Sequence, residues 1–279
     1  MEVQVLRKTE KPERLVCQAA RGDYYEGYVG DTEYAELMES VDYDEEHLKE
    51  ELVAEGIDWL DHNPFEFDDN HPAVLRARTR SFIEKQLARG HYGPWEHPQI
   101  SFVVKGVSRV TMAQITRHRH ITFDIQSMRY ADFSEQEIVV PATLLSDEQR
   151  HERYPHIYDE DGNHFNRDEG VFEMSEEKRA DWRAMYEMRQ TEVREFYQDM
   201  VDAGIPKEDA RFLLPLGTTV NMTFSGNART FLHLLDMRRK ANAQWEIREL
   251  SEALLDELFE WMPYTYSYYD NHGPNKLSP

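Results

Sequence analysis

Hydrophobic and polar residues alternate in segments that we expect to form strands. Residues 99–107 (QISFVVKGV) place an apolar side chain at every second position, which is the period of a half-buried strand. Residues 218–226 (TTVNMTFSG) show the same alternation. Shorter apolar runs over 1–6 and 135–141 predict two further strands, the second ending at Pro141. The pattern therefore predicts one small sheet.

Helical patterns fill most of the chain between these strands. Residues 73–88 are periodic in apolar side chains and end before Gly90, a residue suited to a helix C-terminus. Residues 108–119 begin at Ser108, whose hydroxyl suits an N-cap. We also expect helices over 44–56, 175–203, 207–214 and 227–262, the last as one helix or two.

The remaining segments show no clear period. Residues 23–70 outside the helix are acidic and aromatic, and residues 146–170 are acidic and rich in His and Tyr, so we expect both segments at the surface. No internal repeat or low-complexity linker divides the chain. Few strands among many helices predict an α+β fold, in which a mixed or antiparallel sheet is packed by helices in a single domain over residues 1–279.

Composition adds a strong acidic bias to this fold. The 279 residues include 54 acidic and 32 basic side chains, for a net charge of −22, and the mean hydropathy is −0.77. Disorder is excluded because aromatic residues, 12% of the chain, are spread along its whole length. The excess of acid disfavours nucleic-acid binding, which needs surplus positive charge. Only nine Lys stand against 23 Arg, and we expect a halophilic protein adapted to molar salt, where charge repulsion is screened.

The chain carries no sign of export or membrane insertion. Cys17 is the one cysteine, so neither an internal disulfide nor a cysteine metal cluster is expected. The first residues contain no apolar stretch of signal-peptide length, and no run approaches the roughly 20 apolar residues of a membrane span. We expect a cytoplasmic protein without a membrane partner.

A cluster of cationic residues stands out against this acidic background. Three arginines (Arg117, Arg119, Arg129) and two histidines (His118, His120) fall within fourteen residues. Guanidinium groups match phosphate oxygens bidentately, so the cluster favours an anionic ligand. The alternative, which the sequence leaves open, is that these arginines pair with the abundant carboxylates.

The same cluster resembles the signature of a known family. Arg117-His118-Arg119 is followed after seven residues by Ser127, and this spacing is similar to that of flavin-dependent thymidylate synthases. Four further motifs agree in order over about residues 70–262: Gly90-His91-Tyr92-Gly93-Pro94-Trp95-Glu96-His97, the run from Gly204 through Ala210-Arg211 to Leu216, Asn227-Ala228-Arg229, and Arg238 with Ala243-Gln244-Trp245-Glu246.

The resemblance implies an enzyme that converts dUMP to dTMP. It implies FAD as cofactor, NADPH and methylene-tetrahydrofolate as co-substrates, and a homotetramer whose sites are shared between subunits. The implied dUMP contacts are Gln114, Arg117, Gln126, Ser127, Arg129, Arg211 and Arg238, with Arg238 also catalytic because it polarises the uracil ring. The implied FAD contacts are His91, Gly93, Arg117, His118, Arg119, Ile125, Asn227, Arg229 and His233.

Some residues depart from the family pattern. Ile125 stands where Glu is frequent, His233 where Asn is common, and Gly93 where Thr is found. A non-catalytic nucleotide- and flavin-binding relative is therefore the alternative function. The proximity of His91, Glu96 and His97 permits a metal site, but no HExxH or repeated Asp pattern accompanies it, and we expect no metal.

Overall fold

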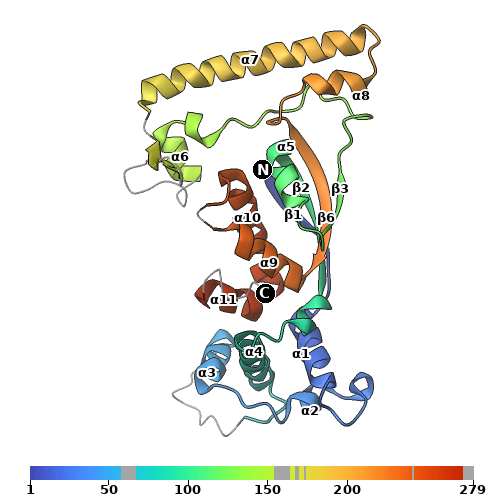
Figure 1. The fold of residues 1–279 in the computed structure, drawn as a ribbon. Helices are drawn as coiled ribbons and strands as arrows, with labels where there is room; N and C mark the ends of the chain where they lie inside the picture. Colours follow the sequence, from blue (N-terminus) through green and yellow to red (C-terminus); the bar gives the residue numbers. More distant parts are fainter. Residues whose placement is uncertain (58–66, 154–163, 167–169, 173, 241, 273–279) are drawn as a thin grey trace. The chain divides into compact units, whose positions relative to one another are not determined.

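The computed structural model describes residues 1–57, 67–153, 164–166, 170–172, 174–240 and 242–272. The strands are β1 (Glu2–Lys8), β2 (Gln99–Ser108), β3 (Thr122–Ile125), β4 (His164–Asn166), β5 (Gly170–Phe172) and β6 (Thr219–Asn227) (Figure 1). The α-helices are α1 (Pro12–Gly22), α2 (Tyr34–Met38), α3 (Glu45–Ala54), α4 (Pro72–Ala88), α5 (Arg109–Ile115), α6 (Asp147–Arg153), α7 (Glu176–Asp202), α8 (Lys207–Ala210), α9 (Ala228–Arg238), α10 (Trp245–Trp261) and α11 (Pro263–His272). Short 3-10 turns include η4 (Gly93–Glu96) and η6 (Arg211–Leu213). These elements confirm the α+β class.

The contacts divide the chain into two compact units. Unit 1 contains residues 1–4, 102–225 and 238–254, and unit 2 contains residues 5–101, 226–237 and 255–279. Each unit is described by itself below. None of the described helices is long and apolar enough to cross a membrane.

The main sheet has the strand order β1-β2-β6-β3. β3 pairs antiparallel with β6, with Phe123 opposite Phe224 and Ile125 opposite Met222. Alternate residues of β6 are buried, and the Phe224 ring lies 5.7 Å from the rings of both Phe102 and Phe123. The period-2 pattern of the sequence thus becomes the aromatic core of unit 1.

The predicted strand over 135–141 is wrong. Only one isolated bridge forms there, between Ile138 and Thr218, and the strand that pairs with β6 is instead β3. β3 pairs with residues 222–225 of β6, whereas the stretch before Pro141 lies beside residues 217–219. Its backbone hydrogen bonds there include one from Val139 N–H to the Gly217 carbonyl (2.9 Å).

The helix expected over 108–119 is shorter than the pattern suggested. The Ser108 hydroxyl does cap it by accepting from Thr111 N–H, but α5 ends at Ile115. Thr116 then bonds back to the Met112 carbonyl through its hydroxyl (2.9 Å), and a hydrogen bond from His118 N–H to the Ile115 carbonyl turns the chain. β-Branched residues at this point weaken further helical propagation.

Most of the other predicted elements are confirmed. α7 begins after the N-cap Ser175, and Gly90 and Gly204 adopt positive φ values of 74° and 88° after the ends of α4 and α7. The helices α1, α2, α6 and α11 were not predicted. α2 carries the fully buried Leu37 and Met38 in a segment expected to be extended surface, and α11 forms from the aromatic C-terminal stretch.

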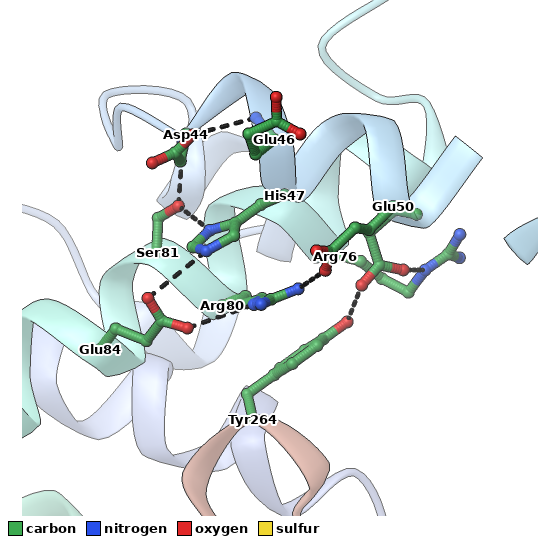
Figure 2. A network of polar contacts seen from close by, with 10 residues as sticks. Asp44, Glu46, His47, Glu50, Arg76, Arg80, Ser81, Glu84 and Tyr264 are labelled. Carbon is green, nitrogen blue, oxygen red and sulfur yellow. Dashed lines mark hydrogen bonds and ion pairs between the residues drawn. The ribbon is translucent and has the colours of Figure 1, made fainter. Parts of the chain in front are cut away.

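In unit 2, α3 packs against α4 around an apolar cluster of Leu48, Leu52, Ala73, Val74 and Ala77. Beside this cluster, arginines of α4 pair with carboxylates of α3 (Figure 2). Arg76 contacts Glu51 and Glu55 at 2.5 Å each, and Arg80 pairs with Glu50 and Glu84. In this network each guanidinium has two carboxylate partners.

Candidate active site

Arg238 occupies the last position of α9 and is half-buried within unit 1. Its Nε–H donates to Nε2 of His118 (3.0 Å), and an Nη2–H donates to the Gln114 carbonyl (3.0 Å). Burial lowers the pKa of Arg238, and the nearby charge of Arg117 lowers it further. Among the described residues no carboxylate pairs with Arg238 or Arg117. The charges of Arg238 and Arg117 therefore repel one another, with no carboxylate counter-ion in the described part of the chain.

The turn after α5 carries the Arg-His-Arg part of the signature. Arg117 and Arg119 are exposed, whereas His118 between them is buried and accepts the hydrogen bond from Arg238. The turn thus directs one imidazole inward and two guanidinium groups outward. A continuous helix to residue 119 would have placed these three side chains about 100° apart around its axis.

A buried carboxylate fixes the start of α5. Glu246, near the first turn of α10, accepts from Ser108 N–H (2.6 Å) and from the Ser108 hydroxyl. The Gln244 side-chain oxygen caps α10 by accepting from Glu246 N–H (3.1 Å) and Ile247 N–H (3.2 Å). The same oxygen accepts from the Gln114 amide (3.4 Å). The N-termini of α5 and α10 are therefore joined, and Gln114, whose carbonyl accepts from Arg238, bonds to the same cap.

The second half of the signature follows β3 along the edge of β6. Gln126 N–H donates to the Asn221 carbonyl (2.9 Å), and the Gln126 side-chain oxygen accepts from Asn221 N–H (3.3 Å). The Ser127 hydroxyl accepts from Arg129 N–H (3.3 Å). Because β3 is a strand, Ile125 occupies a ladder position opposite Met222. The Gln126 and Ser127 side chains therefore already have backbone partners, Asn221 N–H and Arg129 N–H.

Arg129 and Arg211 both contact Glu208, Arg129 through the side-chain carboxylate and Arg211 through the backbone carbonyl. Nε and Nη2 of Arg129 each approach Oε2 of Glu208 at 2.9 Å. Nε–H of Arg211 donates to the backbone carbonyl of the same Glu208 (3.0 Å). The structure therefore brings these two predicted residues together, although 82 positions separate them in the sequence (211 − 129).

Unit 2 holds the other residues that the resemblance assigns to FAD. Arg229 pairs with Glu96, and Nδ1 of His91 lies 2.9 Å from the Gln86 side-chain oxygen. Asn227 caps α9 by accepting from the N–H and hydroxyl of Thr230 (2.8 and 2.7 Å). Gly93 opens η4, and His233 lies about one turn after Arg229 on α9.

Gly93 is not a steric necessity at its position. No atom lies within 4 Å of the place where a Cβ would stand, so the residue found there could be larger without a clash. By contrast Asn227 and Arg229 already have protein partners, which a ligand would supplement or replace.

Two residues of unit 1 were not singled out by sequence reasoning as site residues. Glu246 was noted only as part of a motif, and Arg109 was not noted at all. The available signal for Arg109 was its charge beside the N-cap Ser108 in a chain that is otherwise acidic. Its guanidinium lies against Met128 of the signature, with Nη1 2.7 Å from Sδ.

Comparison with known proteins is consistent with this geometry. The family model "Thymidylate synthase complementing protein" matches residues 4–264. A flavin-dependent thymidylate synthase of Halobacterium salinarum is 41% identical over 282 residues, and that of Haloarcula marismortui is 37% identical over 282 residues; both alignments cover all of each chain. The chain belongs to the flavin-dependent thymidylate synthase family.

A solved structure shares the fold of this family member. A UMP/dUMP methylase from Streptomyces cacaoi, crystallised with 5-Br dUMP, superimposes with a TM-score of 0.67 at 19% identity, covering 100% of this chain and 97% of that chain. The likeness supports the α+β architecture of flavin-dependent thymidylate synthases for both units described above. The comparisons span both units, because the matched residues include parts of each.

Proposed function

We propose that this protein methylates dUMP to dTMP, with methylene-tetrahydrofolate as carbon donor, NADPH as reductant and FAD as hydride carrier. The observation that supports this most directly is the hydrogen bond of Arg238 to His118, the residue next to Arg117, together with the lowering of the Arg238 pKa by the charge of Arg117. Two guanidinium groups without a carboxylate partner among the described residues form a preformed site for negative charge. Family membership supplies the nucleotide and the reaction.

Arg238 is the proposed catalytic residue. Hydride addition to C6 of uracil puts negative charge on the ring oxygens and N3, and a fixed cation at that edge stabilises the charge as it develops. The hydrogen bonds to His118 and to the Gln114 carbonyl hold the guanidinium in one orientation, so little reorganisation is needed. Because His118 accepts from Arg238, its Nε2 carries no proton in this arrangement.

The remaining dUMP contacts are assigned by the resemblance to Gln114, Arg117, Gln126, Ser127, Arg129 and Arg211. Their chemistry fits a nucleotide monophosphate, because amide, hydroxyl and guanidinium groups all donate hydrogen bonds. Arg129 already has Glu208 as a partner, so phosphate would compete with or add to that ion pair.

FAD fits the donors assigned to it. In unit 1, Arg117 and Arg119 are exposed and have no carboxylate partner among the described residues, as a diphosphate ligand requires. In unit 2, Arg229, Asn227, His91 and His233 add donors and acceptors. When bound, the flavin supplies the hydride chemistry, and the protein orients and polarises the substrate. The backbone beside Gly93 and Ile125 completes the assigned set.

The assembly we propose is a homotetramer with sites shared between subunits. In unit 1, one side of α7 exposes the large apolar side chains Trp182, Met185, Met188 and Phe196. Two more are exposed on η6 and in the segment after it, Phe212 and Leu216. Spacings of three and eight residues place those of α7 within one sector of the helix. Clustered exposed apolar residues are typical of subunit interfaces.

The proposal also includes a single functional domain that contains both units, a cytoplasmic location and adaptation to high salt. The family match runs through both units, and two of its relatives come from Halobacterium and Haloarcula species. Because the net charge is −22, repulsion between acidic side chains should unfold or dissociate the protein when it is transferred from molar to millimolar salt. Circular dichroism and light scattering during that transfer test the expectation.

The decisive experiment measures dTMP formation by the purified protein in high salt. Product must form only when dUMP, methylene-tetrahydrofolate and NADPH are all present, and the sample must carry a flavin spectrum that NADPH bleaches. A protein that binds flavin and dUMP without forming dTMP is the non-catalytic relative, and that result rejects the proposed reaction.

A further inference from the structure

Arg109 lies at a point where three separate segments of unit 1 meet. It is the first residue of α5, and its N–H donates to the Thr218 carbonyl (3.2 Å). The next residue, Val110, donates to the Leu216 carbonyl (3.3 Å). These bonds attach the start of α5 to the segment that follows Arg211.

The Arg109 side chain extends toward the signature segment. Its Nη1 lies 2.7 Å from Sδ of Met128, the residue between Ser127 and Arg129. The half-buried guanidinium therefore adjoins the two signature residues that the resemblance assigns to dUMP. Met128 itself is buried, so the contact is part of the packed structure.

The charge around Arg109 is not balanced. Burial lowers the pKa of Arg109, and the positive charge of Arg211 lowers it further. Among the described residues no carboxylate pairs with Arg109, although acidic residues outnumber basic ones by 54 to 32. A desolvated guanidinium beside a second cation is unfavourable unless an anion binds there.

A count of charges gives the class of the anion. Arg109, Arg129 and Arg211 bring three positive charges to this region, and Glu208 supplies one negative charge through its contact with Arg129. The excess of two positive charges matches a phosphate monoester, which carries about −1.5 to −2 at neutral pH. A neutral ligand would leave the two cations uncompensated.

We infer that Arg109 is a further substrate-binding residue, which together with Arg211 binds the phosphate group of the nucleotide. This inference rests on the proposed function, since dUMP supplies the phosphate. The alternative is a purely structural role, in which Arg109 only packs its aliphatic stem against Met128.

The test compares dUMP with deoxyuridine, which lacks the phosphate. In Arg109→Gln and Arg109→Met, the dissociation constant for dUMP, measured through the change it causes in the flavin spectrum, should rise about 10- to 100-fold. The weaker affinity for deoxyuridine should change less than about twofold. Arg109→Met keeps an apolar stem against Met128, and Arg109→Lys, which keeps the charge, should restore part of the affinity.

The matched control is Arg183→Gln, which removes an arginine of α7 that pairs with Glu187 in the same unit. It should leave both affinities unchanged. Equal loss of dUMP and deoxyuridine binding, unchanged dUMP binding, or failure of Arg109→Met to fold would each overturn the inference. The formation of dTMP by the wild-type protein is measured separately. If dTMP forms while any of these results is obtained, the proposed function stands and only the role of Arg109 is rejected.

Discussion

Two groups of arginines, one from each unit, make different contacts. In unit 2, Arg76 and Arg80 of α4 each contact two carboxylates, and the network of Figure 2 extends through Glu51 to the Tyr264 hydroxyl (2.7 Å). In unit 1, Arg238 and Arg109 donate instead to an imidazole, a carbonyl and a thioether. Among the described residues neither has a carboxylate partner.

The two interpretations that the sequence left open divide between the arginines of the signature. Arg129 pairs with Glu208, whereas Arg117 and Arg119 have no carboxylate partner among the described residues. In a chain with this acidic excess, carboxylate neighbours are readily available to an arginine, as in the α3–α4 network. The arginines near the signature that remain beside other cations retain unsatisfied charge in the ligand-free protein. Such an arrangement lowers stability locally and increases the affinity for an anion.

The largest expected effect follows from removing a cation without a carboxylate partner. Arg238→Ala should lower the rate of dTMP formation about 100- to 1000-fold, equivalent to roughly 3–4 kcal/mol of transition-state stabilisation. Steady-state assays with saturating co-substrates measure it, and the visible spectrum should show that flavin remains bound. Turnover at the wild-type rate would reject the catalytic role of Arg238.

The converse case is found in unit 2, where a buried carboxylate has no cationic partner among the residues that the structure describes. Glu13 of α1 accepts from Thr265 N–H at the start of α11 (2.8 Å), and burial raises its pKa to about 7, against an ordinary value of 4.5. The folded state thus holds a proton that the unfolded state releases between these values. The resulting stability is fully present below about pH 4.5 and is lost as pH rises through about 7.

Glu13→Gln cannot ionise and still offers an oxygen to Thr265. Its free energy of unfolding should therefore exceed that of the wild type by up to roughly 3 kcal/mol near pH 8, and the gain should vanish toward pH 4.5. Denaturant titrations at several pH values measure the difference. Glu10→Gln, at an exposed position nearby, is the control, and a gain independent of pH would contradict the explanation.

A smaller effect on activity is expected at Glu246, the carboxylate that holds the start of α5. Glu246→Gln keeps one acceptor for Ser108 but removes its charge, so the start of α5 and the Gln114 carbonyl should shift slightly. We expect dTMP formation to fall about tenfold, roughly 1.4 kcal/mol. Asp256→Asn, on an exposed position of α10, should leave the rate unchanged. Equal rates in both variants would remove Glu246 from the site.

The smallest effect is expected where arginine is fully paired. Arg80→Met should change activity less than about twofold and lower the free energy of unfolding by about 1 kcal/mol, because its partners Glu50 and Glu84 are partly exposed and screened by solvent. Thermal unfolding in high salt, with the rate measured in parallel, checks both values. A loss of activity comparable to that of Arg238→Ala would remove the distinction between the two groups of arginine.

Several features of this protein depend on neighbours a few positions away, and the sequence alone determined them. Ser108 and Ser175 cap the helices that follow them, Gly90 and Gly204 end the helices before them, and the alternating apolar residues of β6 form a buried face. The ordered motifs likewise identified the family. Such signals are local because capping, turns and periodicity involve only adjacent turns of the chain.

Only the tertiary structure decided which charges meet. Arg238 contacts His118 across 120 positions, and Glu246 bonds to Ser108 across 138. Arg109 bonds to the Thr218 carbonyl after η6, and the charge of Arg211 lowers its pKa. The end of α5 at Ile115 and the place of β3 against β6 also escaped the local pattern. Long-range pairs depend on how the sheet and helices pack together, and the same arginine is paired or unpaired according to the neighbours that packing brings to it.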